Sequence, residues 1–266
     1  MPAVEVFDCE SQTVGESTRE GRPAAALLVF ASEVKTAAAR SWPAQSALAV
    51  VLQVRARALC VLLWERAREP FAGRWSLPGG ELEAAETLEE SIRRHLAVKV
   101  DVREVAHLEQ LATYSDPGRN PARWELATAY LGLVPLGVDP HVPTDTRWHP
   151  VDALPATAFD HDEIVLAGRE RLRGKLSYTN VGFALAPPAF TLAELREIYV
   201  AALGHEVSAT NLKRVLGRRG ALEPTGERRP SGPGGGRPAE VFRFRRRELE
   251  VTDPFAALRP PLEAGS

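Results

Sequence analysis

Residues 77–100 read LPGGELEAAETLEESIRRHLAVKV and hold the densest grouping of chemically active side chains in the sequence. A glycine pair leads into a predicted amphipathic helix rich in glutamate, and carboxylate oxygens are ligands that Mg²⁺ prefers in a metal site. Carboxylates three and four residues apart share one helix face and can bind Mg²⁺ or Mn²⁺ together. The segment ends instead in HLAVK, and Glu90 lies about 7.5 Å before His95 along the helix axis and on another face. We therefore expect the loop and helix of such a site without its metal-binding side chains.

Hydrophobic periodicity predicts the elements that position this segment. The aliphatic runs ALAVVLQV and LCVLLWER, at 47–54 and 59–66, are typical of paired strands. A helix is predicted over about 85–98, and the segments 105–114 and 124–134 are again strand-like. The SDPGRNPAR sequence between the last two segments has turn chemistry. The first part of the chain is therefore predicted as strands, one internal helix and further strands.

The second part of the chain predicts helices followed by a hairpin. A connecting helix is expected to begin at Asp160 or Asp162 as its N-cap. Thr191 and Glu194 have the spacing of a capping box at the start of the next helix, and another helix is predicted over about 208–219. A strand-like LEPT, a tip rich in Gly, Pro and Arg, and the strand EVFRFR complete the series. Helix, turn, helix and hairpin is the order of a winged helix-turn-helix.

Charge is distributed unevenly along the 266 residues, although the net charge is only −2. Asp and Glu outnumber Lys and Arg by 25 to 17 in residues 1–170, whereas Lys and Arg outnumber them by 15 to 6 in residues 171–247. Such a basic block is either a solvated face or a surface for nucleic acid. The two parts of the chain are therefore expected to face different partners.

Composition favours a soluble cytoplasmic protein that does not engage a membrane. The apolar run AAALLVFA near the N-terminus is about half of the roughly 20 residues that a spanning helix needs. Cys9 and Cys60 are the two cysteines, and they offer neither a disulfide framework nor a zinc site. We expect no cofactor and no bound metal.

Residues 80–102 resemble the Nudix box, Gly-x5-Glu-x7-Arg-Glu-(apolar)-x-Glu-Glu-x-Gly-(apolar). The positions that match at the right spacing, and that we expect to have structural roles, are Gly80, Glu86 and Arg94. The positions where the family places its metal-binding carboxylates are occupied by His95, Val98 and Lys99. A neutral or cationic face can attract a diphosphate directly but lacks a metal-activated water. The resemblance therefore implies a pocket that binds a diphosphate without cleaving it, and no catalytic residue.

Most of the chain, apart from its first 45 residues, resembles the Nudix-related transcriptional regulators of NAD metabolism, the NrtR type. The resemblance covers roughly residues 47–246 and is carried by LEQLATYSDPGRNP, FDHDEI, RLRGKLSYT, FTLAELREIY and GRPAEVFRF. It implies a homodimeric repressor, not an enzyme, that binds palindromic operators in double-stranded DNA. It also implies that the Nudix-like domain senses ADP-ribose or a related NAD metabolite.

The expected fold class is α+β, with an N-terminal Nudix-like α/β/α sandwich around a mixed sheet and a C-terminal winged helix-turn-helix. The expected parts are an extension over 1–44, the effector-binding domain over 45–156, a linker helix over 157–180, the DNA-binding domain over 181–250 and a tail over 251–266. The basic block then belongs to the part that meets DNA.

Candidate DNA contacts follow from the way a helix-turn-helix docks. Its second helix enters the major groove by the N-terminal half, which nominates Thr210, Asn211, Lys213 and Arg214. Asn and Arg suit bidentate contacts with A and G. The basic residues expected at phosphates are Lys175, Arg218 and Arg219. The arginines expected to reach the backbone or the minor groove from the hairpin tip are Arg228, Arg229 and Arg237.

Candidate effector contacts lie near the glycine loop and in the turn between strands. Arginines suit a diphosphate, which nominates Arg74, Arg119 and Arg123. Trp75 suits stacking on adenine, and Lys99 is nominated by its position on the helix.

Two alternatives remain open on the sequence. One is a Nudix-type hydrolase that releases AMP from ADP-ribose with an unorthodox metal site. The other keeps the regulator but changes its effector to a sugar, because similar regulators of sugar metabolism share this architecture.

Overall fold

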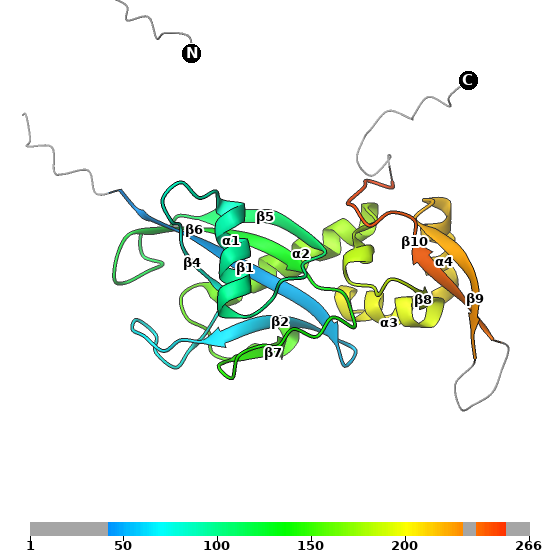
Figure 1. The fold of residues 1–266 in the computed structure, drawn as a ribbon, viewed down its shortest axis with the longest axis horizontal. Helices are drawn as coiled ribbons and strands as arrows, with labels where there is room; N and C mark the ends of the chain where they lie inside the picture. The colour runs from blue at the N-terminus through cyan, green and yellow to red at the C-terminus, as the bar shows by residue number, and fades with distance from the viewer. Residues whose placement is uncertain (1–41, 231–237, 254–266) are drawn as a thin grey trace, which may run out of the picture. The chain divides into compact units, whose positions relative to one another are not determined.

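The computed structural model describes residues 42–230 and 238–253 of the chain (Figure 1). The larger sheet has seven strands, with the order β3-β2-β1-β6-β5, and with β4 paired to β1 and β7 paired to β2. Its strands are β1 (Ala44–Arg55), β2 (Ala58–Glu65), β3 (Trp75–Ser76), β4 (Gly79–Glu81), β5 (His107–Tyr114), β6 (Glu125–Leu133) and β7 (Thr146–Pro150). Strands β1 and β6 are parallel and the other pairs are antiparallel. The predicted mixed sheet is confirmed.

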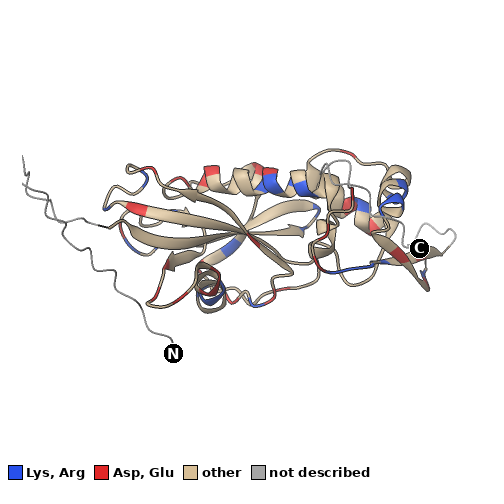
Figure 2. Cartoon of the chain, turned by 90° about the horizontal axis from the view of Figure 1, so that it is seen from above, with Lys and Arg blue, Asp and Glu red and all other residues tan. Residues whose placement is uncertain are grey.

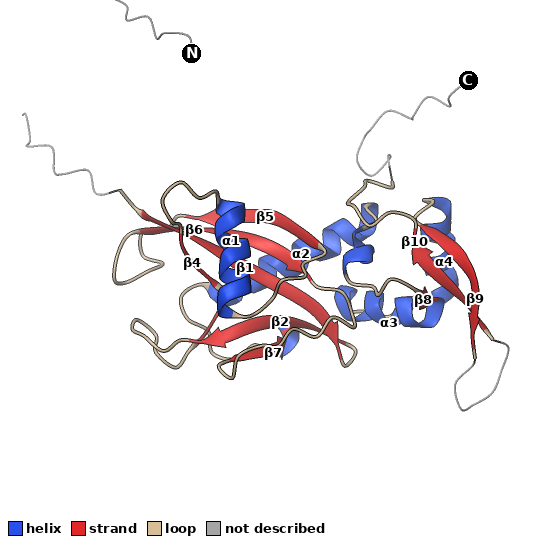
Figure 3. Cartoon of the chain, in the orientation of Figure 1, coloured by secondary structure: helices blue, strands red, loops and turns tan. Residues whose placement is uncertain are grey.

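Strand β1 is apolar along nearly its whole length because both faces of the sheet are covered. Ala47, Ala49 and Val51 belong to the core under helix α1 (Leu88–Lys99). The alternate residues from Leu48 to Val54 belong to the core under helix α2 (His161–Tyr178). Helix α2 packs closely there, since a Cβ at Gly168 would lie 2.8 Å from Val50 Cγ1. The sheet therefore lies between two helical layers (Figure 3).

The C-terminal part has the expected helices and hairpin. Its helices are α3 (Leu192–Leu203) and α4 (Ala209–Arg218), and its three-stranded sheet has the order β8-β10-β9, with β8 (Phe190–Thr191), β9 (Leu222–Arg229) and β10 (Ala239–Phe244). The predicted capping box of α3 is present, with Thr191 as N-cap and Glu194 at N3. Gly204 ends α3 with φ of 77°, in the left-handed region that favours glycine. The winged helix-turn-helix is confirmed.

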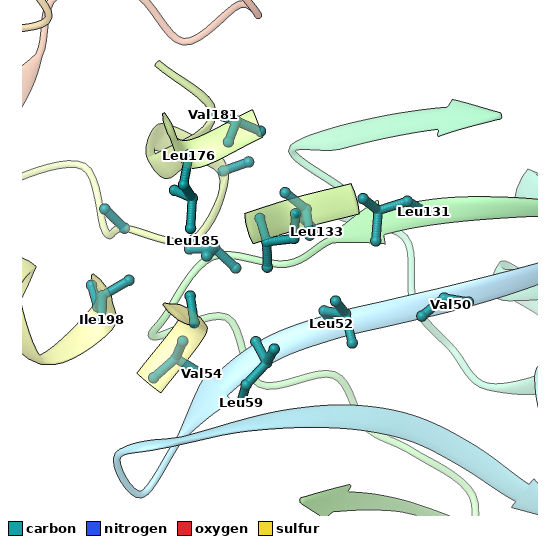
Figure 4. Packing of buried hydrophobic residues seen from close by; sticks show 14 of the residues in the cluster. Val50, Leu52, Val54, Leu59, Leu131, Leu133, Leu176, Val181, Leu185 and Ile198 are labelled. Atoms are coloured by element: carbon teal, nitrogen blue, oxygen red, sulfur yellow. The ribbon is translucent and has the colours of Figure 1, made fainter. Parts of the chain in front are cut away.

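Apolar packing joins the winged helix to the sheet. The short helices η1 (Val151–Ala153) and η2 (Val181–Ala184) lie in the connecting segments. Leu176 of α2, Leu185 after η2 and Ile198 of α3 share one buried cluster with residues of β1 and β6 (Figure 4). The described residues from Pro43 onward accordingly form one compact unit.

Several element boundaries differ from the predictions. Helix α1 begins at Leu88, not near 85, because Thr87 and Glu90 form a capping box. Strand β9 extends to Arg229, so it is longer than the predicted LEPT strand. The expected N-terminal extension falls almost wholly outside the described residues. Within the described ranges, no helix combines the length and the hydropathy needed to cross a membrane.

Candidate effector cleft and nucleic-acid interface

A cleft of about 960 Å³ opens between α1, the start of α2 and the loops at one end of the sheet. Its basic lining residues are Arg66, Arg68, Arg94, Lys99, Arg119 and Arg123, and its acidic ones are Glu69, Glu81, Glu83 and Glu125. Three of the five predicted effector contacts, Lys99, Arg119 and Arg123, lie together in this lining, although they come from α1 and from the β5–β6 loop. The tertiary structure thus gathers cations that are far apart in the sequence.

The three replaced carboxylate positions on α1 behave differently from one another. His95 is buried, and its Nε2 donates to the Glu81 carbonyl at 3.0 Å. Burial lowers the pKa of His95, so its ring is neutral near pH 7. Val98 is 77% exposed and does not line the cleft. Among these three residues, Lys99 is the one that carries the positive charge expected for this face of α1.

Lys99 is held in place from two sides. Its Nζ donates to the Gly79 carbonyl at 2.6 Å and lies 5.4 Å from the centroid of the Trp64 ring. Burial, together with the charges of Arg94 and Arg66, lowers the pKa of Lys99. Gly80 is required beside it, because a Cβ there would lie 2.6 Å from His95 Cε1 and 3.1 Å from Lys99 Nζ. The ammonium group is therefore held in place, near the positive charges of Arg94 and Arg66.

Glu86 and Arg94 brace the loop that precedes α1. Arg94 donates to both carboxylate oxygens of Glu86, at 2.6 and 2.7 Å. The hydrogen bond from Arg94 lowers the pKa of Glu86 to about 2. Arg94 also reaches the Glu81 carbonyl at 3.3 Å, and Glu86 accepts from the Glu83 backbone N–H. These bonds join the loop to α1, and the structural role expected of the two residues stays a prediction.

Arg119, which also lines the cleft, is tied to the start of α2. Its Nε and Nη2 donate to the two carboxylate oxygens of Asp160, at 3.0 and 2.6 Å, and its side chain is 4% exposed. Asp160 precedes α2 at the N-cap position, but its carboxylate serves Arg119 and does not cap the helix. His161 lines the same wall, and its Nδ1 accepts the Leu77 N–H at 3.0 Å. Burial lowers the pKa of His161 to about 3, which keeps it neutral.

Arg74 and Trp75 do not line the cleft, although the sequence nominated both. Arg74 is exposed, and the Trp75 ring packs at 4.3 Å against His149 of β7. A short strand turns Trp75 towards β7, so a residue next to the glycine loop in sequence faces another part of the fold. Arg66 and Phe159 take part in the lining instead, and sequence reasoning missed them. Only their places in the sequence could have pointed to these two residues: Arg66 is the last residue of the LCVLLWER run, and Phe159 is the first residue of the FDHDEI segment.

Among the described residues, no group of three or more His, Cys, Asp and Glu side chains is arranged to hold a metal ion. Three of the four cleft acids, Glu81, Glu83 and Glu125, are in ion pairs with arginines, as with Arg123 and Glu81 at 2.6 Å. The side chains that converge on the cleft are therefore suited to an anion held by guanidinium and ammonium groups.

Helix α4 presents the predicted base-reading residues to solvent. The exposed side chains on it are those of Thr210, Asn211, Lys213, Arg214 and Arg218, and α4 contains no acidic residue (Figure 2). Its Leu212 and Leu216 are buried, as predicted for core positions. Arg214 Nη2 donates to Asn211 Oδ1 at 2.6 Å, which orients the two side chains together.

Three of the residues nominated for phosphate or minor-groove contacts are engaged within the protein. Lys175 is 13% exposed and pairs with Glu109 at 2.8 Å, and Arg219 is 15% exposed and pairs with Asp253 at 3.2 Å. Arg229 pairs with Glu194 at 2.8 Å, because β9 continues beyond the predicted strand and brings it to α3. Arg228 is exposed on β9, and Arg237 falls outside the described residues.

Two family models match the chain, each over one of its structural parts. The NUDIX domain matches residues 42–167, and the NrtR DNA-binding winged helix domain matches residues 182–244. A relative from Acinetobacter baylyi, named as an ADPR responsive transcriptional repressor, is 30% identical over 74% of this chain and 80% of its own length.

Two further proteins that are similar to this chain are a regulator solved with DNA and a pyrophosphatase. Shewanella oneidensis NrtR, solved in complex with a 27mer DNA, is 31% identical with a TM-score of 0.64, covering 75% of this chain and 93% of that one. An ADP-ribose pyrophosphatase from Methanocaldococcus jannaschii is 31% identical over 40% of this chain and 63% of its own length. Since the relatedness to the Acinetobacter repressor extends over both the Nudix and the winged-helix parts, the chain belongs to the NrtR family of Nudix-related transcriptional regulators.

Proposed function

We propose that this protein is a transcriptional repressor that binds palindromic operators as a homodimer and responds to ADP-ribose or a related NAD metabolite. One observation carries the proposal: a cleft lined by Lys99, Arg119 and Arg123 lies in the same compact unit as an exposed, basic recognition helix. Because it acts on DNA, we place its work in the cytoplasm. The names of the Acinetobacter relative and of the Shewanella complex support both halves of the proposal.

The effector half rests on the chemistry of α1. At the three positions where the Nudix box has metal-binding carboxylates, the chain has a neutral buried His95, an exposed Val98 and an anchored Lys99. A diphosphate can then be held by direct charge-assisted hydrogen bonds from Lys99 and the cleft arginines. We therefore propose that the cleft binds the diphosphate of the effector without a divalent metal and does not hydrolyse it.

The DNA half rests on α4 and β9. Asn211 and Arg214 are suited to bidentate base contacts, and Arg218 and Arg228 are exposed for phosphates. Lys213 lies 3.5 Å from Glu240 and is 55% exposed, so it can exchange this partner for DNA. Operator binding should weaken steeply with salt, since each phosphate contact releases counterions.

The test is a mobility-shift titration of the full chain on palindromic sites upstream of NAD synthesis or salvage genes, with and without ADP-ribose. We expect a specific complex with steep salt dependence whose affinity changes when ADP-ribose is added. A flat salt response and no preferred site would contradict the DNA half. Calorimetry with ADP-ribose and with pentoses in the presence of EDTA separates the NAD metabolite from a sugar effector.

A hydrolase is the second candidate, because the Methanocaldococcus relative is named as an ADP-ribose pyrophosphatase. This function would be supported if the wild-type chain released AMP from ADP-ribose in the presence of Mg²⁺ or Mn²⁺. The Glu86→Gln variant should then lose this activity. Since Glu86 is bound by Arg94 through both oxygens, we expect no such release from the wild-type chain.

A further inference from the structure

Two aromatic residues near the cleft have a backbone conformation that bulky residues rarely adopt. Phe71 has φ of 69° and Phe159 has φ of 54°, both in the left-handed region. They lie in different loops, yet their rings meet edge to face with centroids 5.0 Å apart. Strain of this kind persists only where the surroundings impose it, and it gathers at ligand-binding sites.

Arg66 completes this group, which we call the Phe–Arg platform (Arg66, Phe71 and Phe159). The Arg66 guanidinium lies 4.8 Å from the centroid of the Phe159 ring, and its Nε donates to the Pro70 carbonyl at 3.0 Å. These two contacts fix the plane of the guanidinium. Arg66, Pro70 and Phe159 all line the cleft, and Phe71 is 37% exposed beside them.

The loops that carry the platform are held by backbone hydrogen bonds. In the β2–β3 loop, the Arg66 N–H donates to the Arg74 carbonyl at 3.0 Å and the Gly73 N–H donates to the Arg66 carbonyl at 2.8 Å. In the loop before α2, the Ala158 N–H donates to the Trp75 carbonyl at 2.8 Å. A ligand that stacks on the platform does not have to order these loops first, which favours affinity.

We propose that the Phe–Arg platform binds the purine base of the effector, while Lys99 and Arg123 bind its diphosphate. The inference rests on the proposed effector, and it replaces the adenine contact that the sequence assigned to Trp75. Aromatic rings and guanidinium planes both stack on nucleobases, and the positive charge of the guanidinium adds to that attraction. Trp64 is a poorer base partner, because the cation over its ring is Lys99, which the proposal assigns to the diphosphate, and because its Nε1 donates to the Leu77 carbonyl.

The test compares Arg66→Lys and Phe71→Leu with wild type, using calorimetry with ADP-ribose and fluorescence of an etheno-adenine analogue of ADP-ribose. Stacking quenches the etheno base, so quenching reports the contact directly. We expect each substitution to weaken ADP-ribose about tenfold and to reduce quenching, because it removes a stacking surface but preserves the charge or the apolar character. Arg74→Lys is the matched control, since Arg74 belongs to the same loop, is exposed and lies outside the cleft lining.

Melting temperatures must stay close to wild type for the comparison to count, and Phe159→Leu serves as the second variant if Phe71→Leu unfolds. Wild-type affinity and quenching in Arg66→Lys and in the phenylalanine variant would overturn the platform and leave the proposed effector standing. If the wild-type chain does not bind ADP-ribose, both the base-binding role of the Phe–Arg platform and the proposed effector are overturned.

Discussion

At the scale of the residue, Lys99 is the side chain on which the proposed direct binding of a diphosphate most depends. At a position where the family holds a metal, its ammonium group is anchored to the Gly79 carbonyl and faces the cleft. A fixed cation binds a diphosphate directly but generates no metal-activated water. The neighbouring Val98 belongs to the same motif and points away into solvent, so the motif positions are not equivalent.

Replacing Lys99 with Met should weaken the binding of ADP-ribose about 10- to 150-fold, because a hydrogen bond from a charged group is worth about 1.5–3 kcal/mol. The measurement is calorimetry in EDTA. Val98→Ala is the matched control on the same helix and should keep wild-type affinity, since Val98 is 77% exposed and outside the cleft. Equal losses in both variants would contradict a specific role for Lys99.

Glu109 should make the protein sensitive to acid. Burial raises its pKa, but the bonds from His107 and Lys175 outweigh this and lower it to about 2, against an ordinary 4.5. The depressed pKa stabilises the fold above the unfolded value, and this contribution is lost as the pH falls from about 4.5 to about 2. In Glu109→Gln, the free energy of unfolding should be lower at neutral pH and should fall less across that window.

Urea denaturation at a series of pH values measures this effect. The control is Glu89→Gln, because Glu89 pairs with Arg93 on the exposed side of α1, at 59% exposure. If Glu109→Gln keeps the full acid dependence of wild type, the partly buried ion pair with Lys175 does not contribute as described.

At the scale of the element, helix α4 separates two functions that the sequence grouped together. Its N-terminal half presents Asn211 and Arg214 to solvent as a hydrogen-bonded pair. Its C-cap, Arg219, turns inward and donates to the Ser177 carbonyl at the end of α2. One end of the helix is therefore available to DNA, while the other end secures the helix to the rest of the chain.

Arg214→Ala should reduce operator affinity by about 1–3 kcal/mol and relax the preference for one base pair, because it removes a bidentate contact. Arg219→Ala should mainly lower the melting temperature, since it removes the hydrogen bonds by which Arg219 ties the end of α4 to Ser177 and Asp253. Mobility-shift titrations on operator variants and thermal denaturation measure the two effects. A larger loss of operator affinity in Arg219→Ala than in Arg214→Ala, with an unchanged melting temperature, would reverse these roles.

At the scale of the whole molecule, α2 connects the cleft to the winged helix. Asp160, which precedes α2, binds cleft-lining Arg119 through both oxygens, and Ser177 near its other end accepts from Arg219. Arg119 Nη1 is not used in the pair with Asp160, so a bound anion can meet the same guanidinium that holds α2. Allosteric coupling of about 1–3 kcal/mol is typical of such ligand-controlled proteins.

Asp160→Asn should reduce the effect of ADP-ribose on operator affinity while keeping ADP-ribose binding within a few-fold of wild type. The substitution keeps the size of the side chain but breaks the charge pair with Arg119. Operator titrations at zero and saturating ADP-ribose give the coupling factor. An unchanged coupling factor in Asp160→Asn would show that α2 responds to the cleft by another route.

The sequence by itself determined the element order, the degenerate Nudix box and the winged helix. These depend on local spacing, so apolar alternation, the capping box at Thr191 and the positions of His95, Val98 and Lys99 could all be read directly. Side-chain direction could not be read in this way. Only the tertiary structure decided that Trp75 packs on His149, that Lys175 pairs with Glu109, and that Arg66 meets Phe159 in the cleft. These contacts join residues far apart in the chain, and they depend on how the sheet orders its strands and where α2 crosses it.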